Sequence, residues 1–110
     1  MCLKMEIKLS DQKYFVEFYT KESCIYSILE TCNSLSQAVM DCERCDYLED
    51  YLRLKVEPIL RKELIEGMGN MIVALGQIME LYGISQEELQ SAVNTADAVN
   101  RKEFLENKGE

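Results

Sequence analysis

The chain of 110 residues has no histidine, one proline and five glycines. Without histidine it cannot build the Ser/His and Cys/His nucleophile systems or most zinc sites, because each needs an imidazole. Any catalysis would have to rest on carboxylates and a hard metal ion. The few prolines and glycines, together with 47% hydrophobic residues, indicate a single globular domain and not a disordered chain.

Long apolar runs and an excess of basic residues are also missing. No apolar run reaches the roughly 18 residues that span a bilayer, and residues 1–13 lack the apolar core of a signal peptide. We therefore expect a cytoplasmic protein without a membrane segment. Lys and Arg number 12 against 20 Asp and Glu, which gives a net charge of -8. Because such a chain repels a phosphate backbone, we expect no direct binding of nucleic acid.

The five cysteines are an odd number in a chain that we expect to be intracellular, which predicts reduced thiols that pack as small apolar side chains. Cys42 and Cys45 form a CxxC motif, for which metal binding or redox chemistry is the alternative. Redox CxxC motifs follow a strand and open a helix, whereas this one closes a predicted helix. The other cysteines are Cys2, Cys24 and Cys32.

Residues 59–83 are predicted to form the central helix of a small bundle. Apolar residues recur there at steps of three and four, the period of one buried helix face. Glu63, Glu66 and Asn70 lie at i, i+3 and i+7 on the edge of that face, so their side chains can point at a common spot. The apolar residues are Leu64, Met68, Met71, Ile72, Leu75, Ile78, Met79 and Tyr82.

Three glycines interrupt this helix, and each costs about 1 kcal/mol relative to alanine. We expect close approach of another backbone or of a ligand to compensate for that cost. The helix is also apolar on two sides, which suggests self-association. The glycines are Gly67, Gly69 and Gly76.

The chain is predicted to consist of an extended or flexible arm over residues 1–9 and a single helical domain over residues 10–108, which includes the central helix. A short helix after Ser10 is favoured, with a β-hairpin through residues 10–13 as the alternative. Residues 21–44 then form a long amphipathic helix. Its predicted buried stripe consists of Cys24, Ile28, Cys32, Leu35, Val39 and Cys42.

Turn and capping signals divide the rest of the chain. Asp46 is predicted to cap the start of a further helical segment. Pro58 is predicted to interrupt the helical structure just before the central helix. Gly83 closes that helix, and Ser85 opens the last one, over residues 85–107. The last helix is predicted to pack through Leu89, Val93, Ala96 and Val99, with a polar row of Asn94, Asp97 and Arg101.

This order of a long helix, a charged turn, a second long helix ending in Gly-Ile-Ser and a last helix resembles a known family. It is similar to the small MazG-like members of the all-α nucleoside triphosphate pyrophosphohydrolase superfamily. The similarity is best over residues 71–90 and extends more loosely from Phe15 to Phe104. It implies an all-α MazG-like bundle of four to five helices, a core completed by dimer or tetramer formation, and a phage or prophage relative.

The metal-binding motifs of that family are degenerate in this chain. Family enzymes carry Glu-Glu-x-x-Glu on the first long helix and Glu-Glu-x-x-Asp on the second, and the last two acidic residues of each bind Mg²⁺. Here the leading residues Glu30 and Glu66 are kept. The implied ligand positions are Thr31, Ser34, Gly67 and Asn70. Neutral oxygens bind a divalent cation weakly and glycine offers none, so we expect neither catalytic residues nor a bound cofactor.

Three functions follow from this comparison. The first is a MazG-like protein that has lost hydrolase activity and binds a nucleotide or a protein partner. The second is an active Mg²⁺-dependent pyrophosphohydrolase, in which a shifted cluster of Glu30, Glu63 and Glu66 holds the metal. Lys62 or Arg101 would then contact phosphate. The third is an acidic helical adaptor, or an inhibitor that imitates nucleic acid.

Overall fold

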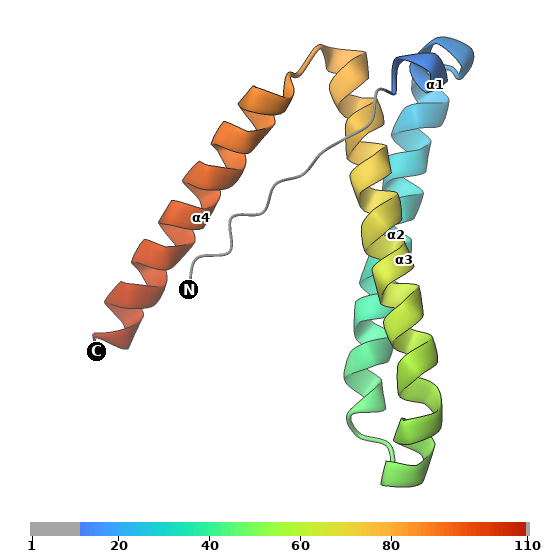
Figure 1. The fold of residues 1–110 in the computed structure, drawn as a ribbon, viewed down its shortest axis with the longest axis vertical. Coiled ribbons are helices and arrows are strands. Elements are labelled where there is room, and N and C mark those ends of the chain that lie inside the picture. Colours follow the sequence, from blue (N-terminus) through green and yellow to red (C-terminus); the bar gives the residue numbers. More distant parts are fainter. Residues whose placement is uncertain (1–11, 110) are drawn as a thin grey trace.

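A computed structural model describes residues 12–109, which form four α-helices and no strand (Figure 1). The predicted all-α class is confirmed, and α1 is helical over the described part of the segment for which a hairpin was the alternative. The arm over residues 1–9 lies outside the described residues. The helices are α1 (Lys13–Phe18), α2 (Lys21–Cys45), α3 (Asp50–Tyr82) and α4 (Gln86–Lys108).

Helices α2 and α3 form an antiparallel hairpin, which is the main helix packing in the described chain (Figure 1). At its open end the Lys21 ammonium lies 5.1 Å from the centre of the Tyr82 ring, a cation–π contact. Nearer the turn, the Cys42 thiol donates to the Leu60 carbonyl oxygen over 3.7 Å. These contacts define the register of the two helices.

The seam between α2 and α3 follows steps of three and four residues on both helices, the spacing of an antiparallel coiled coil. Every seam residue is buried or half-buried. Several are small, so the two backbones come close together. The seam residues are Cys24, Ile28, Thr31, Leu35, Ala38, Cys42 and Cys45 on α2, and Leu60, Leu64, Gly67, Met71, Ala74, Ile78 and Leu81 on α3.

Local capping explains most of the helix ends. The Thr20 hydroxyl accepts from the Ser23 N–H at 3.2 Å at the start of α2. Gly83 ends α3 in the left-handed conformation at φ 64°, and the Ile84 N–H donates to the Met79 carbonyl oxygen. The Ser85 hydroxyl then accepts from the Glu88 N–H at 3.1 Å. The predicted closure at Gly83 and start at Ser85 are confirmed.

Two predicted boundaries are wrong. Asp46 does not open a helix: it ends α2, and its N–H donates back to Glu43 and Arg44. Pro58 does not interrupt the helix, because α3 runs continuously through it. Pro58 and its neighbour Glu57 are exposed, and so is Leu54, whose carbonyl would pair with the N–H that proline lacks. Water can replace that donor on an exposed stretch, so the helix continues.

Helix α4 leaves the hairpin after residues 83–85 and makes no substantial contact with another described helix (Figure 1). None of its residues is fully buried, although Leu89 and Val93 are half-buried, and the predicted stripe of Leu89, Val93, Ala96 and Val99 does not pack against another helix within residues 12–109. The radius of gyration is 17.6 Å, against about 13 Å for a compact domain of this length. The chain is therefore an open arrangement of one hairpin and two helices that flank it.

Candidate functional site

One side of the hairpin is polar. The residues that immediately precede the seam positions project to a common side of the hairpin. Successive residues of a helix are rotated by 100° about its axis, and in two antiparallel helices seen from one end these rotations run in opposite directions. Among those that precede the seam positions from Cys24 to Cys42 on α2 and from Leu64 to Leu81 on α3, Val73 is the one apolar side chain. We call this side the polar face; it consists of Ser23, Ser27, Glu30, Ser34, Gln37 and Asp41 on α2, and Glu63, Glu66, Asn70, Val73, Gln77 and Glu80 on α3.

A groove of 360 Å³ runs across the middle of the polar face. It brings together the polar row Glu63, Glu66 and Asn70 of α3, as their spacing predicted, and it faces them with Ser34 of α2. Four of the six motif positions therefore meet in one place. The groove is lined by Ser34, Gln37, Ala38, Asp41, Glu63, Glu66, Gly67 and Asn70.

Glu30 and Thr31 do not join this groove. The Thr31 hydroxyl donates to the Ser27 carbonyl oxygen at 2.8 Å, so it is bonded within its own helix. Glu30 lines a separate shallow hollow on α2, which it shares with Glu22 and Tyr26. The suggested cluster of Glu30, Glu63 and Glu66 is thus divided between two sites. Within residues 12–109, no group of three or more Cys, Asp or Glu side chains is placed to hold a metal ion.

The charges in the groove are mainly negative and partly paired. Glu66 lies 3.9 Å from the ammonium of Lys62, one turn earlier on α3, with both side chains exposed. Asp41 accepts from the Gln37 side-chain amide at 2.8 Å. Exposed ion pairs of this kind contribute about 0–1 kcal/mol, so they leave the carboxylates available to other cations. The groove is therefore an acidic, hydrogen-bonding surface.

Of the two predicted phosphate contacts, only Lys62 is next to the groove. Arg101 lies on α4, where its guanidinium is 3.0 Å from the Asp97 carboxylate. This pair joins two members of the predicted polar row on α4. Since α4 does not pack on the hairpin, the described structure does not bring Arg101 to the groove.

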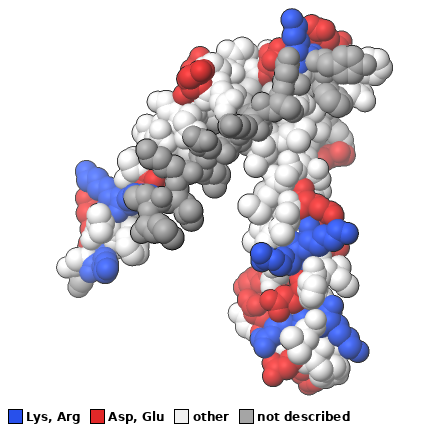
Figure 2. Space-filling view, in the orientation of Figure 1, with Lys and Arg blue, Asp and Glu red and all other residues white. Residues whose placement is uncertain are grey.

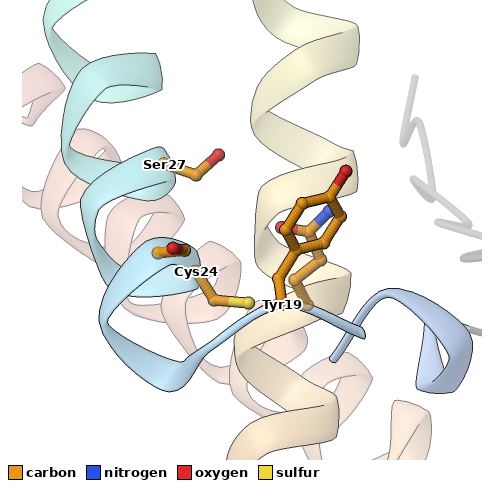
Figure 3. A pocket seen from close by; sticks show the side chains of 5 residues that line it. Tyr19, Cys24 and Ser27 are labelled. Carbon is orange, nitrogen blue, oxygen red and sulfur yellow. The ribbon is translucent and has the colours of Figure 1, made fainter. Parts of the chain in front are cut away.

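A second hollow, of 320 Å³, lies near the open end of the hairpin (Figure 3). Tyr19 reaches it from the link between α1 and α2, opposite Cys24 and Ser27 on the first turns of α2. Ser23 and Gln77 also line it. Sequence reasoning missed this hollow. The available signal was the i, i+4 spacing of Ser23 and Ser27, which puts two hydroxyls one turn apart on the same stripe.

The CxxC cysteines lie at the end of α2 that adjoins the turn of the hairpin. Cys45 is the last residue of α2 and is buried, whereas Cys42 is half-buried in the seam. Burial, together with the nearby carboxylates of Glu57 and Asp46, raises the pKa of the Cys45 thiol. A thiol with a raised pKa is a poor nucleophile and a poor metal ligand at neutral pH. Cys24, Cys32, Cys42 and Cys45 are all free thiols.

The opposite side of the hairpin is apolar and only partly exposed in the described structure: Ile25, Ile72, Leu75 and Met79 are half-buried, and α1 packs on α3. Its residues immediately follow the seam positions, so it lies across the hairpin from the polar face. Four residues that were predicted to be buried lie on this side and not in the seam. Met68, Tyr82, Cys32 and Val39 are exposed. We call its apolar part the apolar face; it consists of Ile25, Leu29, Cys32 and Val39 on α2, and Ile65, Met68, Ile72, Leu75, Met79 and Tyr82 on α3. Ser36, Glu43, Asp46 and Arg61 also follow seam positions but are polar or charged.

Charged side chains collect at the turn end of the hairpin, and both signs are present there (Figure 2). The hollow between Glu43, Asp46 and Glu57 also contains Arg61. Such a mixed surface differs from the uniform negative charge of a nucleic acid.

Comparisons with family models, with curated proteins and with solved structures find no match to this chain. Among residues 12–109, no helix is both long and apolar enough to cross a membrane.

Proposed function

We propose that this chain is a MazG-like helical protein that acts by binding a partner and does not hydrolyse nucleotides. The groove on the polar face carries the proposal. Motif positions from two helices meet there, which is the arrangement that the resemblance implies. Ser34, Gly67 and Asn70 occupy positions where a metal site needs carboxylates, and Thr31 is bonded to its own helix.

A protein partner with a basic surface suits the groove better than a nucleotide does. Asp41, Glu63 and Glu66 repel a triphosphate unless a divalent cation lies between them. The same carboxylates, with the Gln37 and Asn70 amides, can accept hydrogen bonds from Arg and Lys side chains. The exposed position of the groove also leaves room for a peptide segment.

We also propose that the protein works as a homo-oligomer. Its accessible surface is 9004 Å², whereas a compact monomer of 12.7 kDa exposes about 6,200 Å². The excess of roughly 2,800 Å² is as large as the share that one chain buries in an obligate homodimer. Association would cover apolar surface that the chain does not cover itself.

The first experiment is calorimetric titration of Mg²⁺, and then of a non-hydrolysable dNTP, with pyrophosphate release assayed on the same sample. We expect neither heat nor turnover. Metal binding together with turnover would overturn the proposal and favour an active pyrophosphohydrolase that uses Glu63 and Glu66.

A second titration tests the acidic groove with an octa-arginine peptide as the probe. We expect binding that weakens with salt and that falls in the double variant Glu63→Gln/Glu66→Gln. The matched control removes two carboxylates from α4, in the variant Glu103→Gln/Glu106→Gln, where both residues are exposed. If both variants lose affinity equally, the peptide responds only to net charge and the groove is not a binding site.

A further inference from the structure

The CxxC pair at the turn end of the hairpin has no part in the proposed function. Cys42 and Cys45 lie one turn apart at the end of α2, and both line the hollow of 320 Å³ beside Glu57 and Arg61 of α3. In an α-helix the Cα atoms of residues i and i+3 are about 5 Å apart, inside the range of roughly 4.4–6.8 Å that a disulfide bridges. The geometry of the backbone therefore allows the two cysteines to be joined.

We propose that Cys42 and Cys45 are a redox modification site, at which a small, positively charged disulfide converts the two thiols into one intramolecular disulfide. The structure shows the reduced form, in which both thiols are free. The inference does not depend on the proposed function, because neither cysteine lines the groove on the polar face.

The two thiols differ in access, and this difference sets the order in which they react. Cys42 is half-buried at the hollow, and its thiol makes one long hydrogen bond, of 3.7 Å, to the Leu60 carbonyl oxygen. Cys45 is only 4% exposed, so a dissolved reagent does not reach it directly. Cys42 is therefore the thiol that the reagent meets, and Cys45 is the thiol that closes the bridge.

The reaction is two successive thiol–disulfide exchanges. The Cys42 thiolate attacks one sulfur of the reagent, whose S–S bond breaks, and the first small thiolate leaves. The Cys45 thiolate then attacks the Cys42 sulfur of this mixed disulfide, and the second small thiolate leaves. The two cysteines lose two electrons and two protons in total, and the small disulfide gains them as two thiols.

The closing step is possible although Cys45 is a poor nucleophile toward a dilute reagent. Its attack on Cys42 is intramolecular, and such proximity raises a rate by orders of magnitude. The bridge also needs the two Cβ atoms to approach by about 1 Å. The end of α2 can adjust in this way, because the N–H groups of Asp46, Tyr47 and Leu48 already donate to the carbonyl three residues back, each at 3.1 Å.

The charges around the hollow select the reagent. Glu43, Asp46 and Glu57 line it against the single cation of Arg61. A disulfide that carries ammonium groups is attracted to this surface, whereas one that carries carboxylates is repelled. Cystamine is the simplest cationic probe, and dithiodiglycolate is an anionic disulfide of similar size.

The first experiment treats the folded wild-type protein with cystamine and maps its cysteines by mass spectrometry, after an acid quench and alkylation with iodoacetamide. Trypsin cleaves after Arg44, which separates Cys42 from Cys45. We expect the two tryptic peptides to stay joined through these cysteines, and dithiothreitol to restore both thiols. Cys32 is exposed and has no cysteine one turn away, so it should keep a cysteamine group.

Two variants and the second reagent test the order and the charge. Cys45→Ser should leave cysteamine on Cys42, and Cys42→Ser should leave Cys45 unmodified. Dithiodiglycolate should react with Cys42 roughly tenfold or more slowly than cystamine at low salt, and the difference should shrink as salt is added. The same ratio at Cys32 is the control for the net charge of the whole chain, and it should be smaller.

Several results would overturn the proposal. A wild-type Cys42 that keeps cysteamine would show that the bridge does not close, and a Cys42 that stays unmodified after Cys32 has reacted fully would show that the hollow does not admit the reagent. Modification of Cys45 in Cys42→Ser would contradict the order. Equal reagent preferences at Cys42 and Cys32 would remove the role of the hollow's charges. The wild-type map needs no variant, so it decides the proposal even where a serine variant fails to fold.

Discussion

Leu35 of α2 packs over Gly67 of α3, where a Cβ at position 67 would lie 3.4 Å from the Leu35 Cδ1 atom. The expectation that another helix approaches closely is therefore correct for Gly67. It is wrong for Gly69, because a Cβ there would meet nothing within 4 Å. Two glycines separated by one residue thus differ in the reason for their presence.

Replacement of Gly69 by alanine should stabilise the fold. The substitution removes the entropic cost of glycine in a helix and meets no steric obstacle, so the free energy of unfolding should rise by about 1 kcal/mol. Gly67→Ala should give a smaller gain, since the new methyl group contacts Leu35. Urea unfolding followed by circular dichroism, at one fixed protein concentration, measures both. A loss of stability in Gly69→Ala would mean that position 69 is covered in the working protein.

Replacement of Gly83 by alanine should have the opposite effect. Its φ of 64° lies in the left-handed region, where a Cβ costs about 1–2 kcal/mol. The matched control is Gly109→Ala, because Gly109 ends α4 at φ -74°, which suits any residue. Thermal unfolding should show a lower midpoint for the first variant and little change for the second. Equal effects would contradict the assignment of the α3 cap.

Pro58→Ala should stabilise α3. Alanine restores the N–H that can donate to the Leu54 carbonyl and removes the clash of the proline ring with the preceding turn. Proline in a helix interior costs about 3 kcal/mol of stability. The unfolded chain of the alanine variant is more flexible, which offsets up to about 1 kcal/mol of the expected gain. We therefore expect a gain of about 2 kcal/mol in urea unfolding. No gain would show that the helix ends at Pro58 in solution.

The Cys45 thiol should make stability depend on pH at the alkaline end. Its pKa in the folded chain is raised above the ordinary value of 9.0, so folding favours the protonated form. The resulting stabilisation is fully present below pH 9 and is lost as the pH rises toward the folded-state pKa. Cys45→Ala removes this contribution, so the stability difference between wild type and variant should shrink above pH 9. Cys32→Ala, which removes an exposed thiol, is the matched control for the loss of a cysteine.

The helix ends were predictable where one residue decides them. Thr20, Gly83 and Ser85 cap through bonds to residues at most four positions away, so a short stretch of sequence contains the whole cause. Pro58 was not predictable in this way. Whether proline breaks a helix depends on its exposure, which is a property of the folded chain.

The groove was predictable in part for a related reason. Glu63, Glu66 and Asn70 share one face because of the helical period alone, and Ser34 meets them because it precedes Leu35, which packs on Gly67 next to Glu66. Glu30 shares the polar face but lies one turn from Ser34 toward the open end of the hairpin, a register that only the packing of α2 on α3 determines. The choice of seam was not predictable either. Both stripes of α3 are apolar, so periodicity could not choose between Met68 and its neighbour Gly67. Small residues such as Gly67 and Ala38 let the helices approach, and that selects the seam.

The two unlike sides of the hairpin also set a limit to growth. A two-helix layer with apolar side chains on both sides would stack on further copies without end and polymerise into filaments. In this chain the row from Glu63 to Glu80 is polar, so the proposed oligomer could not grow through that side. Val73 is the one position where that row is already apolar. Replacement of Glu63, Glu66 and Glu80 by leucine should therefore favour open-ended association of the chain into fibres.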